Sequence, residues 1–393
     1  MKLLKLALGG FDLFEDGRLD VDFFASDRVA DRRGVAEVEA PIYTNNVLAF
    51  AGINATGKTT TLKLMLGALN ILAGRSLSQE FLEMAFSFAG DIIELEALFW
   101  HEGEYYCLSS LISCVEDGAS LGEDRWRFTD ETLWVASSVP TKKTLASFDE
   151  FKHVARIAQR RRDLAESSLD FLSDDMSMVT ALTRGSRQYL APSLYSDRQW
   201  LRMSEAAIDG SVLKVFDDSI EECCFDEREG DYRLSFKNGT SITVDGKGEF
   251  LGSFLSDGTV KGANLVRQAI SALRTGGYLL VDEIENHLNK QLVGLIIDLF
   301  ESNELNPHGA VLLFSTHYPE ILDFIKRKDN VYFFSRDDRY RVRVTLYADK
   351  VKRIENKKSE VFLSNYLRGT APKYAVVRDL KTMIQRLTEE DMR

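Results

Sequence analysis

The chain has 393 residues, of which 45% are apolar, 10% aromatic and 28% charged, and its formal net charge is −12. This composition is typical of a globular protein with two or three structural units, and it excludes a disordered or fibrous chain. An acidic molecule repels polyanions, so a nucleic-acid or membrane contact would need a local basic patch, and no apolar run approaches the roughly 18 residues that span a bilayer.

The first third predicts a hairpin followed by a strand, a loop and a helix. Leucines alternate with other residues through 4–8, and the alternation resumes at 19–23 after the turn signal Asp16-Gly17. The compact apolar run 47–51 then leads through a glycine-bearing segment into 60–72, where apolar residues have helical spacing.

The middle of the chain predicts two further hairpins with a charged segment between them. Residues 93–99 and 105–111 alternate across a polar turn, and 232–244 surround the strong turn signal Asn238-Gly239. From about 145 to 190 the chain is charged and poor in turn residues, with the arginine run 160–162, and we expect a helical insert there.

The last third alternates helices with short apolar strands. We expect helices at 260–273 and 290–300, and strands at 278–281 and 310–314. Continuous apolar strands separated by helices indicate a parallel sheet that is covered on both faces.

Four cysteines are spread along the chain, and none has the spacing of a zinc site. Cys223 and Cys224 are adjacent and poorly placed for an ordinary bridge. We interpret the cysteines as small buried side chains of a reduced, cytoplasmic protein.

The segment 52–59, which we call the glycine loop, satisfies the pattern G-x-x-x-x-G-K-[ST] between a predicted strand and a predicted helix. Glycines let the backbone wrap a phosphate chain, so that successive N–H groups and the positive helix end face the anion. Lys58 would reach the β- and γ-phosphates, and the Thr59 hydroxyl would bind Mg²⁺. The alternative is a glycine-rich turn with a solvated lysine. The residues expected to hold the nucleotide are Gly52, Asn54, Ala55, Thr56, Gly57, Lys58, Thr59 and Thr60.

Two more polar groups follow predicted buried strands. Asp282 would hold the Mg²⁺ shell, and Glu283 would polarise the attacking water as a general base. His317 comes just beyond the strand 310–314, where a neutral imidazole would bond a γ-phosphate oxygen and the water. A lone histidine is more often a packed or surface residue, so its place at the same sheet edge carries the interpretation.

The segment 254–259, Phe-Leu-Ser-Asp-Gly-Thr, precedes a predicted helix and is called the signature turn below. Ser256 and the following amides would form a helix N-terminus able to bind an anion. Taken alone, this segment is an ordinary helix cap. Its place in the order of motifs along the chain is what suggests a role in binding.

The order of glycine loop, long insertion, signature turn, strand-Asp-Glu and Ser-Thr-His resembles the ATP-binding-cassette class of ATPases. The residues of these motifs are similar to those of the soluble branch, which includes OLD-type and SMC-like ATPases and ATPase subunits of bacterial anti-phage systems. The resemblance covers about 1–72 and 250–335. It implies an α/β head with a P-loop and a mostly parallel core sheet, an antiparallel β subdomain and a helical insert, with ATP and Mg²⁺ as cofactors.

The resemblance also implies a partner. In that family two copies pair head to tail, so Ser256 and Gly258 would act on the partner's γ-phosphate, and Asn286 to Lys290 would cross the interface. We therefore expect at least a homodimer when ATP is bound. The expected division of the chain is 1–144 and 231–340 for the two parts of the ATPase head, 145–230 for the helical insert, and 341–393 for basic tail elements.

Some family features are left open by the sequence. The glutamine that contacts Mg²⁺ in such ATPases is not marked by a motif, and Gln79, Gln159 and Gln188 remain candidates. Phe11 and Phe14 would either stack on the base or belong to the core. The segment after His317 is too short for the nuclease domain of OLD-type enzymes, and no long heptad stretch predicts an SMC-type arm.

Three functions are compared. The favoured one is an ATP hydrolase that acts as a sensor or scaffold for a separate effector protein, a nuclease or toxin, in bacterial anti-phage defence. The alternative is a DNA-repair type of ATPase that binds phosphates through basic residues, although a solvated charged face is the simpler interpretation. The basic residues are either those of the arginine segment, Arg156, Arg160, Arg161 and Arg162, or those of the basic tail, Lys350, Lys352, Arg353, Lys357 and Lys358. The long insertion and the Ile-Glu-Asn-His-Leu sequence after Glu283 speak against a transporter subunit.

Overall fold

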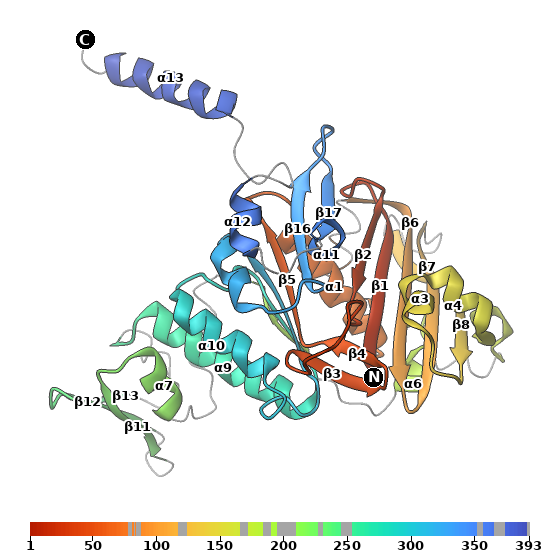
Figure 1. Cartoon of the computed structure of the whole chain (residues 1–393), viewed down its shortest axis with the longest axis horizontal. Helices are drawn as coiled ribbons and strands as arrows, with labels where there is room; N and C mark the ends of the chain where they lie inside the picture. Colours follow the sequence, from red (N-terminus) through yellow and green to blue (C-terminus); the bar gives the residue numbers. More distant parts are fainter. Residues whose placement is uncertain are drawn as a thin grey trace.

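The structure is a computed structural model of the chain. It describes residues 1–77, 81, 83, 88–116, 124–165, 172–183, 190–194, 210–226, 231–244, 254–351, 357–364 and 374–390. Within these residues the protein is an α/β molecule with one mostly parallel sheet and separate antiparallel sheets (Figure 1).

The first layer is a six-stranded antiparallel sheet with the order β2-β1-β6-β7-β8-β9. The hairpin predicted for the N-terminal segment is confirmed, because Leu6 pairs with Val21 across its two strands. The hairpin that turns at Glu102-Gly103 is confirmed as well, and both turn residues have positive φ angles. The strands are β1 (Lys2–Phe11), β2 (Arg18–Asp22), β6 (Ala89–His101), β7 (Glu104–Glu116), β8 (Asp124–Ala136) and β9 (Arg156–Arg160).

The second sheet has the order β10-β14-β15-β5-β16-β17, and all neighbours run parallel except the last pair. Every residue of β5, β14 and β15 is buried, as expected for strands that are covered on both faces. The predicted parallel sheet is thereby confirmed. Its strands are β5 (Val47–Gly52), β10 (Leu190–Ser193), β14 (Tyr278–Val281), β15 (Val311–Thr316), β16 (Val331–Arg336) and β17 (Val342–Leu346).

Helices cover the two faces of the parallel sheet. α1 (Lys58–Leu72) is apolar on nearly all sides, because it lies between the parallel and the antiparallel sheets. Leu48 and Phe50 of β5 point into this core. On the opposite face, α9 (Asp257–Thr275) and α10 (Lys290–Glu301) form a second core with the other residues of β5.

A three-stranded antiparallel sheet forms a small satellite unit beside α9 (Figure 1). The predicted hairpin at Asn238-Gly239 is confirmed, with Gly239 at φ 85°. The unit has its own core, which includes Val260 and Ala263 from the first turns of α9. Its elements are α7 (Gly210–Phe216), β11 (Ile220–Asp226), β12 (Asp231–Phe236) and β13 (Ser241–Val244).

The expectation of a helical insert at 145–230 was wrong for the part of it that the structure describes. No helix in that part exceeds seven residues, and β9 extends the antiparallel sheet by pairing with β8. Arg161 is buried rather than part of a solvated helix face, because it bonds Glu131 of β8. The short helices here are α4 (Phe148–Val154), η1 (Arg161–Asp163) and α6 (Thr180–Thr183), preceded by α3 (Lys142–Ala146).

The remaining elements flank the sheets. No helix among the described residues is long and apolar enough to cross a membrane. In Figure 1 the last helix extends away from the rest of the molecule. These elements are β3 (Val35–Glu39), β4 (Ile42–Asn45), η3 (Pro319–Phe324), α11 (Tyr347–Lys350), α12 (Lys358–Leu363) and α13 (Tyr374–Glu390).

Candidate functional site

The motif residues converge where the parallel strands end, at an edge we call the carboxyl edge. Pairing in register places Ala51 of β5 beside Thr316 of β15, and Gly52 beside Phe334 of β16. Val281 of β14 lies beside Phe314. The residues that follow these strands therefore meet at one place, although they come from segments far apart in the chain.

The glycine loop turns sharply into α1. Gly57 has φ 88°, and a Cβ atom on it would lie 2.7 Å from the Val342 side chain, so a residue with a side chain is excluded on both counts. Ala55 also has a positive φ, of 60°. Of the other predicted loop residues, Asn54 is exposed, Thr60 is half-buried, and Thr56 is buried with its hydroxyl donating to the Ile53 carbonyl over 2.7 Å.

The Lys58 ammonium lies inside the loop. Its Nζ donates to the carbonyl oxygens of Gly52 and Ile53, at 2.9 Å each. Burial lowers the pKa of Lys58 to about 8, while the carboxylates of Asp282 and Glu283 act in the opposite direction. A cation thus lies at the position where the glycine-loop pattern predicts a phosphate contact.

A hydroxyl and a carboxylate meet beside the loop. Thr59 Oγ1 donates to Asp282 Oδ2 over 2.6 Å. Ser315, for which the sequence suggested no role, donates its hydroxyl to the other oxygen of Asp282 and accepts from the Glu283 amide at 2.8 Å. Mg²⁺ prefers oxygen ligands and usually binds one or two protein groups together with substrate phosphates, so Thr59 and Asp282 fit such an ion.

Glu283 and His317 are in direct contact, with Oε1 and Nε2 3.0 Å apart. The other ring nitrogen of His317, Nδ1, lies 3.1 Å from Lys58 Nζ. The same Nδ1 lies 3.0 Å from the Gly52 carbonyl oxygen, so the ring lies between the glycine loop and the Glu283 carboxylate. Glu283 has φ 46°, an uncommon conformation for a glutamate, and such strain is concentrated at functional sites.

Two further charged residues support this pair. Glu285 is buried, and its Oε1 accepts from the His317 amide over 2.7 Å. Lys261, from α9, lies 3.4 Å from the Glu283 carbonyl oxygen, and burial lowers its pKa against the opposing effect of Glu285. Glu285 lies in the motif that follows Asp282, but no local pattern indicated its contact with the His317 amide. No sequence pattern indicated a role for Lys261.

The signature turn begins α9 at the surface. Ser256 is the N-cap, and its hydroxyl accepts from the Thr259 amide over 3.1 Å. Ser256 is exposed, so the turn points outward rather than into the core of its own subunit. Gly258 lies against the carbonyl of His287, which brings the signature turn next to the segment 286–290 that was expected to cross an interface.

Several other sequence candidates lie elsewhere. Phe11 and Phe14 are wholly buried in the core, which settles their alternative in favour of packing. Gln159 lies on β9, at the edge of the antiparallel sheet, while Gln79 and Gln188 are outside the described residues.

Among the basic residues considered for DNA binding, two that the structure describes are buried. Arg161 is buried in an ion pair with Glu131, and Lys358 is buried with its Nζ donating to the Ile325 carbonyl over 2.5 Å. Arg156 and Arg162 are exposed and Arg160 is half-buried. Lys350 and Lys357 are exposed, whereas Lys352 and Arg353 lie outside the described residues.

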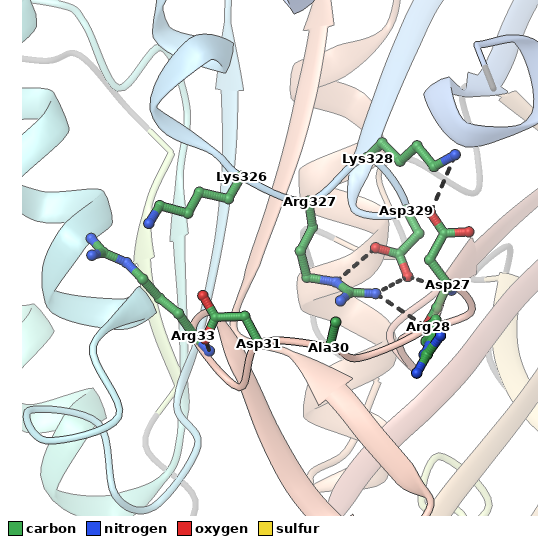
Figure 2. A pocket seen from close by; sticks show the side chains of 9 residues that line it. All are labelled: Asp27, Arg28, Ala30, Asp31, Arg33, Lys326, Arg327, Lys328 and Asp329. Atoms are coloured by element: carbon green, nitrogen blue, oxygen red, sulfur yellow. Dashed lines mark hydrogen bonds and ion pairs between the residues drawn. The ribbon is translucent and has the colours of Figure 1, made fainter. Parts of the chain in front are cut away.

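A cavity of about 370 Å³ lies at the opposite edge of the parallel sheet, before β16 begins (Figure 2). Arg327 pairs with the buried Asp329 at 2.5 Å, and Lys328 pairs with Asp27 at 3.6 Å. The Lys328–Asp27 pair and the Asp27 amide, which donates to Asp329 Oδ2 at 2.8 Å, attach the chain before β3 to the chain before β16. None of the predicted site residues is among them. The cavity is lined by Asp27, Arg28, Ala30, Asp31, Arg33, Lys326, Arg327, Lys328 and Asp329.

The comparisons with known proteins do not place the chain in a family. No protein-family model and no curated protein matched the sequence. The functional interpretation therefore depends on the geometry of the carboxyl edge.

Proposed function

We propose that the protein binds and hydrolyses ATP with Mg²⁺, and that two copies pair head to tail around the nucleotide. One observation carries this proposal: a cation, a hydroxyl–carboxylate pair and a glutamate–histidine pair lie together at the carboxyl edge. These groups are Lys58, Thr59 with Asp282, and Glu283 with His317. Their arrangement matches the needs of phosphoryl transfer to water, which are positioning and charge stabilisation.

Each residue has a defined role in this proposal. Lys58 and the amides of the glycine loop bind the phosphates, and Thr59 and Asp282 hold the metal ion. Mg²⁺ bound there would neutralise charge on the β- and γ-phosphates. Glu283 orients and polarises the attacking water as a general base, and His317 holds the glutamate through Nε2.

The paired arrangement is supported by the exposed signature turn. The N-terminus of α9 presents a positive dipole end at the exposed Ser256, although Asp257 adds a carboxylate to its first turn, and an anion held by another copy could approach it there. Each chain carries one glycine loop and one signature turn. Two copies in head-to-tail contact therefore form two equivalent composite sites.

A sensor or scaffold role that controls a separate effector protein is part of the proposal. It is supported by the satellite unit, whose core is shared with the first turns of α9. A contact at the signature turn would therefore act on a helix that packs into the satellite unit. The setting in bacterial anti-phage defence rests on the sequence resemblance alone.

The test uses the variant Glu283→Gln, which keeps the shape of the side chain and removes its basicity. We expect it to bind ATP, to lose about 10²-fold or more of the hydrolysis rate, and to accumulate as a dimer in light scattering with MgATP. Wild-type protein should dimerise only transiently. If neither protein binds ATP or changes mass with it, the proposal is wrong.

A further inference from the structure

The direction of a bound triphosphate follows from the order of the strands. The groups that would act on the γ-phosphate follow β14 and β15, on one side of β5, whereas β16 and β17 lie on the other side. If the γ-phosphate lies at Glu283 and His317, the ribose and base extend toward the end of β16. This inference rests on the proposed function.

One arginine joins the end of β16 to the glycine loop. Arg336 donates from Nε and Nη2 to the carbonyl oxygen of Ala55, at 3.0 and 2.5 Å, and from Nη1 to the carbonyl oxygen of Tyr340. In a planar trans peptide the C=O and N–H groups point to opposite sides of the chain. Because Arg336 binds the carbonyl oxygen of Ala55 on one side, the N–H of the next residue points to the other side. The guanidinium group of Arg336 therefore bridges the turn after β16 and the glycine loop.

Tyr340 is presented at this turn in an unusual way. The residue is 68% exposed, and its backbone has φ 64°, an outlier for a bulky residue. The turn is held firmly by Asp337, whose carboxylate accepts from the amides of Arg339 and Arg341 at 2.9 and 2.7 Å. Strained backbone conformations cluster at active sites and ligand clamps, and Tyr340 combines such a conformation with high exposure.

The other aromatic residues near this edge do not fit the same role. Phe11 and Phe14 are buried in the core. Tyr318 is exposed, but it follows His317 just after the end of β15, on the side of the proposed γ-phosphate position. Tyr340 is thus the aromatic residue that the strand order favours for contact with a base.

We infer that the turn 336–340 is the base-binding site of the proposed nucleotide pocket, in which Tyr340 stacks on the nucleobase and Arg336 positions the glycine loop. The two roles are separable. Tyr340 acts only on ligands that carry a base, whereas Arg336 acts on any polyphosphate.

The experiment measures binding of two probes by calorimetry, both with Mg²⁺: the nonhydrolysable ATP analogue AMP-PNP and inorganic tripolyphosphate. Tyr340→Asn removes the ring, and asparagine tolerates a positive φ. We expect it to weaken AMP-PNP binding about tenfold, as for loss of a stacked base, and to leave tripolyphosphate binding unchanged. Tyr340→Phe should bind as wild type, and Arg336→Ala should weaken both probes equally.

Tyr374→Ala, which alters an exposed tyrosine on α13, is the control and should change neither affinity. If Tyr340→Asn binds AMP-PNP as tightly as wild type, or weakens both probes equally, the base-binding inference is overturned and the proposed function stands. If wild-type protein binds neither probe, the proposed function fails and the inference fails with it.

Discussion

At the scale of single residues, Lys58 has the most consequential environment. Its ammonium is buried among two loop carbonyls and the imidazole of His317, and burial lowers its pKa to about 8. The ordinary pKa of a lysine side chain is 10.5. The charge that would attract phosphates is therefore lost at a mildly alkaline pH.

The first prediction follows from this shift. Below pH 8 Lys58 already carries its proton, so affinity for Mg-AMP-PNP should be flat. Above pH 8 binding must take up a proton, and affinity should fall by up to about tenfold per pH unit. Calorimetry from pH 7.5 to 9.5 in two buffers measures both the affinity and the proton uptake. Lys58→Arg stays charged, so its weaker binding should not follow this curve, and a flat wild-type curve to pH 9.5 contradicts the prediction.

At the scale of elements, a buried carboxylate joins the antiparallel sheet to the segment after β9. Glu131 of β8 is fully buried and accepts from Arg161 Nη1 at 2.7 Å, from the hydroxyls of Ser110 and Ser177 at 2.9 and 2.5 Å, and from the Met178 amide at 2.9 Å. All of its partners come from outside β8. This network fixes η1 and the segment 173–178 on the sheet.

The second prediction concerns this network. Glu131→Gln leaves Arg161 as an uncompensated buried charge, which should lower the free energy of unfolding by about 3–5 kcal/mol. Urea unfolding measures the change. Arg162→Gln alters the neighbouring exposed arginine, and its effect should stay within about 0.5 kcal/mol. If the two variants lower the free energy of unfolding equally, the buried pair contributes no more to stability than the exposed arginine.

The same elements show what the sequence could predict. The hairpins at Asp16-Gly17 and Asn238-Gly239, the helix after the glycine loop and the parallel strands depend on local patterns, and all were found. β9 was misread, because a run of arginines gives the pattern of a charged helix while the pairing that fixes it lies with β8. β10 is four residues long and contains Pro192, so it gave no signal.

The candidate site also contains residues that the sequence predicted and residues that it did not. Lys58, Asp282 and His317 were predictable because each follows an apolar strand within a short motif. Ser315 and Arg336 were not assigned a role, because their partners are distant in sequence: Arg336 and Ala55 are 281 residues apart. Long-range contacts of this kind are decided by the topology of the sheet, which no local pattern contains.

At the scale of the whole molecule, the proposed site is shared between two copies. Exposed residues occur both in the glycine loop, at Asn54 and Ala55, and in the signature turn, at Ser256. In the proposed function each motif would need the opposite motif of a partner. Two variants that are inactive for different reasons should then complement each other.

The third prediction tests this sharing. Lys58→Met removes the phosphate contact, and Ser256→Arg blocks the signature turn, so each protein alone should be inactive. In an equimolar mixture half of the dimers are mixed and one of their two sites is intact, so hydrolysis should return to about a quarter of the wild-type rate. A phosphate-release assay at increasing protein concentration measures it. A mixture as inactive as its components would mean that each chain hydrolyses ATP alone.

The position of β5 in its sheet has a consequence for how the protein is made. Both neighbours of β5 come from the last third of the chain, Val311–Thr316 and Val331–Arg336. During synthesis the glycine loop therefore emerges long before the strands that flank β5, and a chain interrupted before about residue 336 contains the motif without a complete β16 beside it. If the protein binds a nucleotide as proposed, binding therefore begins only after synthesis has passed residue 336.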